Sequence, residues 1–247
     1  FKRFIEAKHT LKMHDYAAIY EWSIDENELF WQAIWDFHPV ISSKPPTQIK
    51  SKTGNEFYET HWFEGARLNF AENLLQKNND TPAVTFINEN DEITQLNFSN
   101  LKEKVARLSN AMREKGIKKG DRIAGIMPNC IETVIAMLAT ASIGAIWSSC
   151  SPDFGFQGLL DRFKQISPKL IFTVKSYQYN GKTHACLEKV APLLDAIESI
   201  EQIIICPFMN RFPAISAIKK CVLLEAYLSD NLTLTFEQVD FNHPLYI

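Results

Sequence analysis

The chain has 247 residues, of which 46% are hydrophobic and 22% are charged, and its formal net charge is −3. This composition is typical of a globular protein with one large domain and a smaller appendage, and the charge excludes the basic stripe that nucleic-acid binding requires. No run of about 18 apolar residues could cross a membrane. We therefore expect a cytoplasmic protein without nucleic-acid or membrane partners, and the composition indicates no particular oligomeric state.

Residues 1–80 are irregular in pattern and hold four of the five tryptophans. Exposed aromatic surface is unfavourable in water, so we interpret 1–80 as an arm that packs on a main domain formed by 81–247. Arg67 is expected to bond carboxylates or carbonyls that hold this arm. A capping-box spacing of Ser23 and Glu26 predicts a helix at 24–37. A run rich in Pro, Ser and Gly predicts a loop at 42–55, and a short helix is predicted after Asn69.

The remainder alternates between short apolar strands and amphipathic helices after one predicted β-hairpin at 82–97. Such alternation predicts right-handed crossovers and an α/β fold, with a predominantly parallel sheet and helices on both faces. The predicted strands lie at 122–127, 145–149, 169–174, 201–206, 221–224 and 244–247. The predicted helices lie at 101–112 (ended by Gly116), 131–143, 156–166, 187–197 (interrupted at Pro192) and near Phe236, with an irregular stretch after Pro207.

Polar segments follow three predicted strands, at 127–130, 148–155 and 175–182. Ligands bind open parallel sheets at the carboxyl ends of their strands. None of the three segments has the glycine spacing of a dinucleotide or Walker phosphate loop. Lys182 follows an Asn180-Gly181 turn and could meet a phosphate, although its spacing alone favours a solvated surface lysine.

The five cysteines are odd in number, widely spaced and without a CxxC pair. This pattern argues against a disulfide framework and against a zinc site, so no metal site is predicted. Most lie in apolar runs and are expected to pack as small hydrophobes. Cys150 lies in a polar segment and is also expected to pack, because no histidine is adjacent in sequence to activate it.

Two long motifs resemble a known family of enzymes. WFEGARLNFAENLL, at 62–75, resembles the N-terminal signature of the acetyl-CoA synthetase branch of the adenylate-forming enzymes. Residues 118–155 resemble the first subdomain of that superfamily, with Gly-Asp-Arg, Pro-Asn, an apolar helix and Gly-Ala in order. WSSCSPDFG at 147–155 and YNGK at 179–182 are narrower, and they resemble the members of the branch that activate acetoacetate. The resemblance implies that the chain is the first part of the large adenylate-forming domain.

The resemblance also implies a reaction. Acetoacetate, ATP and CoA would give acetoacetyl-CoA, AMP and pyrophosphate through an acyl-adenylate, with Mg²⁺ at the phosphates. In the family, the loop that holds the ATP phosphates follows a strand similar to Pro244–Ile247. We therefore expect this chain to contain no catalytic residue, to bind no cofactor tightly and to be inactive alone.

The resemblance places CoA contacts at one turn. Lys182 stands where the branch has an arginine near the nucleotide end of CoA, and Tyr179 could stack on adenine in place of another arginine. Asn180 and Gly181 complete this turn, and Ser149 stands where the branch has a glycine near CoA. Two alternatives stay open: a ligase for another short acid such as acetate or propionate, or a non-catalytic binding module whose natural chain ends here. An unfinished strand at the C-terminus argues against the module.

Overall fold

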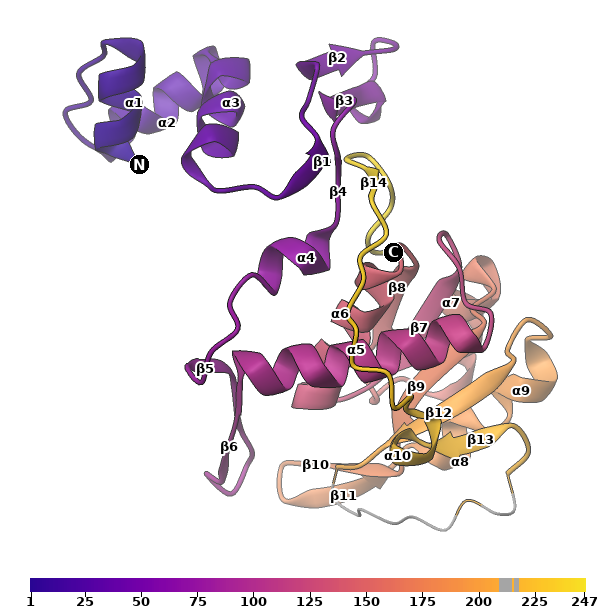
Figure 1. Ribbon diagram of the computed structural model, residues 1–247. Helices are drawn as coiled ribbons and strands as arrows, with labels where there is room; N and C mark the ends of the chain where they lie inside the picture. The colour runs from indigo at the N-terminus through magenta and orange to yellow at the C-terminus, as the bar shows by residue number, and fades with distance from the viewer. Residues whose placement is uncertain (209–214, 216–217) are drawn as a thin grey trace. The chain divides into compact units, whose positions relative to one another are not determined.

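The computed structural model describes residues 1–208, 215 and 218–247. These residues form two compact units, whose elements are drawn in Figure 1. The smaller unit comprises Phe1–Asn69 and Gln238–His243, and the larger unit comprises Phe70–Glu237 and Pro244–Ile247. The interpretation of 1–80 as an arm packed on a main domain stays a prediction.

The smaller unit begins with three helices, α1 (Lys2–His9), α2 (Tyr16–Asp25) and α3 (Asn27–Phe37). The predicted capping box is wrong, because Ser23 lies inside α2 and its hydroxyl donates to the carbonyl of Tyr20. The carboxylate of Asp15 instead accepts the amide N–H of Ala18 at 2.9 Å and begins α2. The predicted helix at 24–37 is thus present as α3 from Asn27, with only its start wrong, and α2 is a separate helix begun by the Asp15 cap.

Short strands follow in the smaller unit, where a loop was predicted at 42–55. The loop prediction is wrong because strands from later in the chain supply the backbone partners, which the local Pro and Ser content does not reveal. Arg67 donates to the carboxylate of Asp240 and to the carbonyl of Gln238, at 3.1 and 2.8 Å, which confirms that it bonds a carboxylate and a carbonyl. Both partners belong to the same unit as Arg67, so its holding of the arm stays a prediction. The elements are β1 (Ser42–Lys44), β2 (Gln48–Lys52), a 3₁₀ turn at Phe57–Glu59, β3 (Thr60–Glu64), β4 (Arg67–Leu68) and β14 (Val239–Asp240).

The larger unit is built on five parallel strands in the order β13-β12-β9-β7-β8. If these five strands are numbered 1 to 5 along the chain and read from β8, their order is 2-1-3-4-5, which is that of a doubly wound fold. In such a fold the direction of the connections reverses between strands 1 and 3, here β7 and β9. At the outer side of β8, Trp147 forms a parallel bridge with Tyr246, where the last strand was predicted. The strands are β7 (Arg122–Ile126), β8 (Ile146–Cys150), β9 (Leu170–Val174), β12 (Gln202–Cys206) and β13 (Cys221–Leu223).

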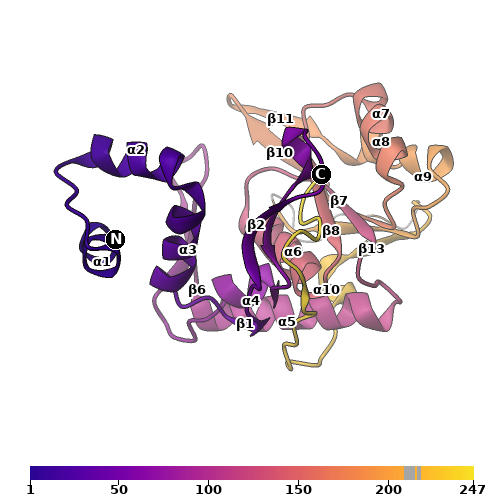
Figure 2. The ribbon, with the colours of Figure 1, turned by 90° about the horizontal axis from the view of Figure 1, so that it is seen from above.

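Helices cover both faces of this sheet, as predicted (Figure 2). Side chains of α5 (Phe98–Glu114) and α6 (Ile131–Ser142) pack on one face, around Trp147 and Phe172. Side chains of α7 (Phe156–Ile166), α8 (Leu187–Val190) and α9 (Leu193–Ala196) pack on the other. In the described part of the chain, no helix combines the length and the apolar character needed to span a bilayer.

The other local predictions for the larger unit have mixed outcomes. The short helix α4 (Phe70–Leu74) and the antiparallel hairpin of β5 (Pro82–Ile87) and β6 (Ile93–Asn97) are confirmed. The helix predicted near Phe236 is wrong, because this stretch has no regular secondary structure and the short helix α10 forms earlier, at Leu224–Tyr227. The irregular stretch predicted after Pro207 lies partly outside the described residues.

A close contact between neighbouring strands restricts one position of β7. A Cβ atom added to Gly125 would lie 2.6 Å from Cζ2 and 2.7 Å from Cη2 of Trp147, whose side chain is buried. The glycine therefore makes room for the indole against the sheet.

We predict that Gly125→Ala lowers the free energy of unfolding by about 1–3 kcal/mol, because the added methyl group overpacks this face. Urea denaturation would measure the change. Trp147→Leu removes the ring, so Gly125→Ala should cost much less in that background than in the wild type. An equal cost in both backgrounds would show that the indole is not the cause.

Candidate functional site

The third polar segment forms a hairpin of two short strands, β10 (Ser176–Tyr179) and β11 (Lys182–Ala185). Asn180 and Gly181 have φ values of 51° and 70° and form the two-residue turn. Two successive left-handed residues are typical of a tight hairpin turn, for which Asn-Gly is a preferred sequence. The predicted turn is confirmed, while the flanking strands were missed because the segment is short and polar.

The hairpin register places the two side chains predicted to meet CoA on the same face. Tyr179 pairs directly with Lys182, and the next pair on the same face is Tyr177 with His184. Directly paired residues, and residues two apart along a strand, share a face of a ribbon. Tyr179 is 62% exposed and Lys182 is also exposed, so both side chains are accessible to a ligand.

The inner pair of this face connects the hairpin to the loop after β8. The ring of Tyr177 stacks on His184 at 5.2 Å between centroids, and its hydroxyl donates to the carboxylate of Asp153. Asp153 also accepts a hydrogen bond from the Ser151 hydroxyl at 3.0 Å. The bond from Tyr177, followed by that from Ser151, holds the pKa of Asp153 below its ordinary value. Burial and the bond to Asp153 raise the pKa of Tyr177 to about 12.

A second contact holds the same loop and comes from α8, which follows the hairpin in the sequence. The ammonium of Lys189, on α8, donates to the carbonyl of Pro152 at 2.7 Å. Pro152 and Asp153 belong to the SPDF part of the motif at 147–155, so this motif is held by groups that follow β9. Sequence reasoning missed Tyr177 and Lys189, although a tyrosine three residues before an Asn-Gly turn is a detectable signal for this face.

Ser149 lies apart from the hairpin turn, at the end of β8. It is exposed and lines a cavity of about 420 Å³ with Cys150, Phe154 and Arg162. The guanidinium of Arg162 lies 4.1 Å from the ring centre of Phe154, which forms one wall. The structure thus groups Tyr179, Asn180, Gly181 and Lys182 at one hairpin tip, whereas Ser149 lies on β8, whose following loop contacts the hairpin through Asp153.

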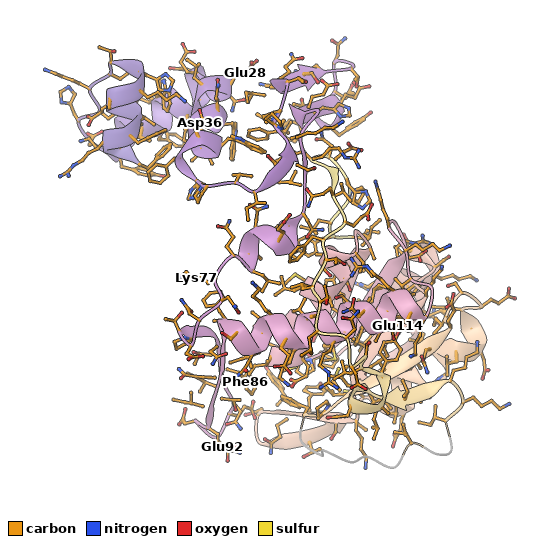
Figure 3. All side chains as sticks on the ribbon, in the orientation of Figure 1. Glu28, Asp36, Lys77, Phe86, Glu92 and Glu114 are labelled. Atoms are coloured by element: carbon orange, nitrogen blue, oxygen red, sulfur yellow. The ribbon has the colours of Figure 1, made fainter. Side chains whose placement is uncertain are left out.

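The amides of the turn already have an acceptor. The backbone N–H of Asn180 donates to Oε1 of Glu89 at 2.7 Å, and that of Gly181 donates to Oε2 at 3.2 Å. Glu89 lies between β5 and β6, in the turn that also contains Glu92 (Figure 3). A ligand phosphate at this tip would therefore meet the side chain of Lys182 rather than these two amides.

The cysteines show the character of packed side chains. All five are free, and burial raises the pKa of Cys150, which disfavours the reactive thiolate. The sequence placed Cys150 in a polar loop, whereas the structure places it at the buried end of β8. Among the residues that the structure describes, no three His, Cys, Asp or Glu side chains converge as metal ligands.

Comparison with known families covers most of the chain. Residues 70–220 match the AMP-binding enzyme family, and residues 16–74 match the acetyl-coenzyme A synthetase N-terminus family. Because the first match spans more than half of the residues, the chain belongs to the AMP-binding enzyme family. The resemblance read from the motifs at 62–75 and 118–155 is confirmed.

Individual proteins that are similar to this chain include several acetoacetyl-CoA synthetases. The acetoacetyl-CoA synthetase of Xenopus tropicalis is 42% identical over 100% of this chain, and the acetoacetyl-coenzyme A synthetase of Rhizobium meliloti is 41% identical over 94%. The solved structure of the acetoacetyl-CoA synthetase from Streptomyces lividans superposes with a TM-score of 0.89 at 33% identity over 99% of this chain. The chain spans 38%, 36% and 38% of the length of these three proteins, respectively.

We predict that Tyr177→Phe raises the pKa of Asp153 toward its ordinary value, because the largest cause of its lowering is lost. A lowered carboxyl pKa stabilises the fold above the pKa of the unfolded chain, and this contribution is lost as the pH falls through the lowered value. Unfolding measurements should therefore separate the variant from the wild type at neutral pH and bring them together in acid.

Titration of the Asp153 carboxyl carbon by NMR would measure the pKa shift directly. Tyr179→Phe is the matched control, because it removes a hydroxyl from the same strand without removing the bond to Asp153. An unchanged Asp153 pKa in Tyr177→Phe would contradict the assignment.

Proposed function

We propose that this chain is part of an ATP-dependent acid–CoA ligase that converts acetoacetate, ATP and CoA to acetoacetyl-CoA, AMP and pyrophosphate. In this reaction the acid is first joined to AMP with release of pyrophosphate, and the acyl group then passes to the thiol of CoA with release of AMP. The observation that carries the proposal is 42% identity over the whole of this chain with an acetoacetyl-CoA synthetase. Membership of the AMP-binding enzyme family supports the adenylate step.

The β10–β11 hairpin is the proposed contact with the nucleotide end of CoA. Lys182 provides an exposed cation for a phosphate, and Tyr179 provides an exposed ring on the same face for the adenine. A charged hydrogen bond and a stacking contact are the interactions that such a ligand needs. Asn180 and Gly181 shape the turn between them, and Ser149 is the proposed contact from the end of β8.

Contacts with ATP and Mg²⁺ are proposed to come from segments outside this chain. The chain spans about 38% of the length of its relatives, so much of a complete ligase is not represented in it. Residues 1–80 are the proposed arm, and 81–247 are the proposed first subdomain of the adenylate-forming domain.

In the full-length protein, we predict that Lys182→Ala raises the KM for CoA about tenfold and leaves the KM for acetoacetate nearly unchanged. One lost hydrogen bond to a charged group costs about 1.5–3 kcal/mol, and exposure to solvent puts the effect at the lower end. Initial rates of thioester formation at varied CoA would measure it. Lys164→Ala, which removes an exposed lysine from α7, is the control. Equal KM values for CoA in Lys182→Ala and the wild type would rule out this role.

We further predict that residues 1–247 alone do not exchange labelled pyrophosphate into ATP when acetoacetate is supplied. The full-length protein in the same assay should do so, and should prefer acetoacetate to acetate and propionate. Clear turnover by residues 1–247 would contradict the assignment of the ATP contacts to other segments. A preference for acetate or propionate would contradict the assigned acid.

A further inference from the structure

One carboxylate joins two hairpins that are distant in the sequence. Each oxygen of Glu89 accepts one backbone N–H of the β10–β11 turn, from Asn180 at 2.7 Å and from Gly181 at 3.2 Å. Hydrogen bonds with a charged acceptor are stronger than those between neutral groups. Two bonds to one carboxylate also fix the orientation of the turn relative to Glu89, whereas a single bond would let the turn rotate about it.

The turn that receives these bonds needs support. Asn180 occupies the left-handed region at φ 51°, which is unfavourable for a residue with a Cβ atom, although asparagine tolerates it better than most residues. The hairpin has four residue pairs, and an isolated two-stranded hairpin is only marginally stable in water. Tyr177 fixes its base through Asp153, and Glu89 fixes its tip.

The segment that presents Glu89 is itself ordered by local hydrogen bonds. The side-chain oxygen of Asn88 accepts the backbone N–H of Asn90 at 2.9 Å and that of Glu92 at 3.0 Å. The amide nitrogen of Asn88 donates to the carboxylate of Glu92 at 2.6 Å. Glu89 is thus held within a closed turn between paired strands, which keeps its carboxylate directed at a defined place.

We propose that Glu89 is a positioning residue for the binding of CoA. This proposal rests on the function proposed above. The Glu89 carboxylate accepts from the backbone of the turn, and the Tyr179 ring and the Lys182 side chain are exposed on their shared face. Holding both side chains before the ligand arrives reduces the ordering that binding requires. The negative charge of Glu89 would repel a phosphate, but water and salt screen exposed charges, whereas the two hydrogen bonds act directly on the turn.

The test uses the full-length protein with Glu89→Ala, Glu89→Gln and the control Asp91→Asn. Asp91 lies in the same turn and its substitution removes the same charge, but the two turn amides donate to Glu89 and not to Asp91. Glu89→Ala should raise the KM for CoA about tenfold. Glu89→Gln should give an intermediate value, because its remaining oxygen accepts one bond, and Asp91→Asn should match the wild type.

Two further readouts separate positioning from a general loss of structure. Pyrophosphate exchange with acetoacetate needs no CoA, so its rate should be the same in all four proteins. Amide hydrogen exchange of a peptide spanning 176–185 should be faster in Glu89→Ala than in Asp91→Asn.

Several outcomes would overturn the inference. They are an unchanged or lowered KM for CoA in Glu89→Ala, a parallel loss of pyrophosphate exchange, and equal hydrogen exchange in Glu89→Ala and Asp91→Asn. A wild-type protein that activates no acid would overturn the proposed function. In that case the hydrogen-exchange comparison still decides whether Glu89 holds the turn.

Discussion

Burial of the parallel sheet on both faces is the constraint on which the rest of the larger unit depends. Ile123, Phe172 and Ile204 point into one helical layer, and Ala124, Ile171 and Ile203 point into the other, all at 0% exposure. Since neighbouring side chains of a strand face opposite ways, a slip of one residue would move every one of these groups to the wrong layer. The register is therefore strongly determined, and it fixes where each strand ends and each polar loop begins.

The candidate site uses that fixed edge but adds its own supports. The loop after β8 and the hairpin after β9 leave strands on either side of β7. Tyr177, within the hairpin, and Lys189, on α8, both bind the loop after β8. Glu89, which precedes the strands of the sheet in the sequence, accepts a hydrogen bond from the tip of the hairpin. Glu89 and Tyr177 thus hold the hairpin, and Lys189 holds the loop beside it.

These supports also give a structural meaning to the narrow sequence motif at 147–155. Its aspartate, Asp153, is bonded to Tyr177 and Ser151. Its cysteine, Cys150, is a buried packing group whose pKa is raised by burial. The motif therefore fixes the loop beside the hairpin.

The sequence alone determined the class of fold, because apolar runs such as LIFTV and amphipathic helices such as 156–166 carry periodic patterns that survive in any context. It also determined the Asn180-Gly181 turn, because few residue pairs adopt two left-handed conformations in succession. Tertiary structure decided the elements with weak local signals, namely the short strands within 42–55, whose partners come from later in the chain. It likewise decided the contacts of Glu89 and Tyr177, because hydrogen bonds between residues 24 to 92 positions apart depend on which chain segments the sheet brings together, and no local pattern records that.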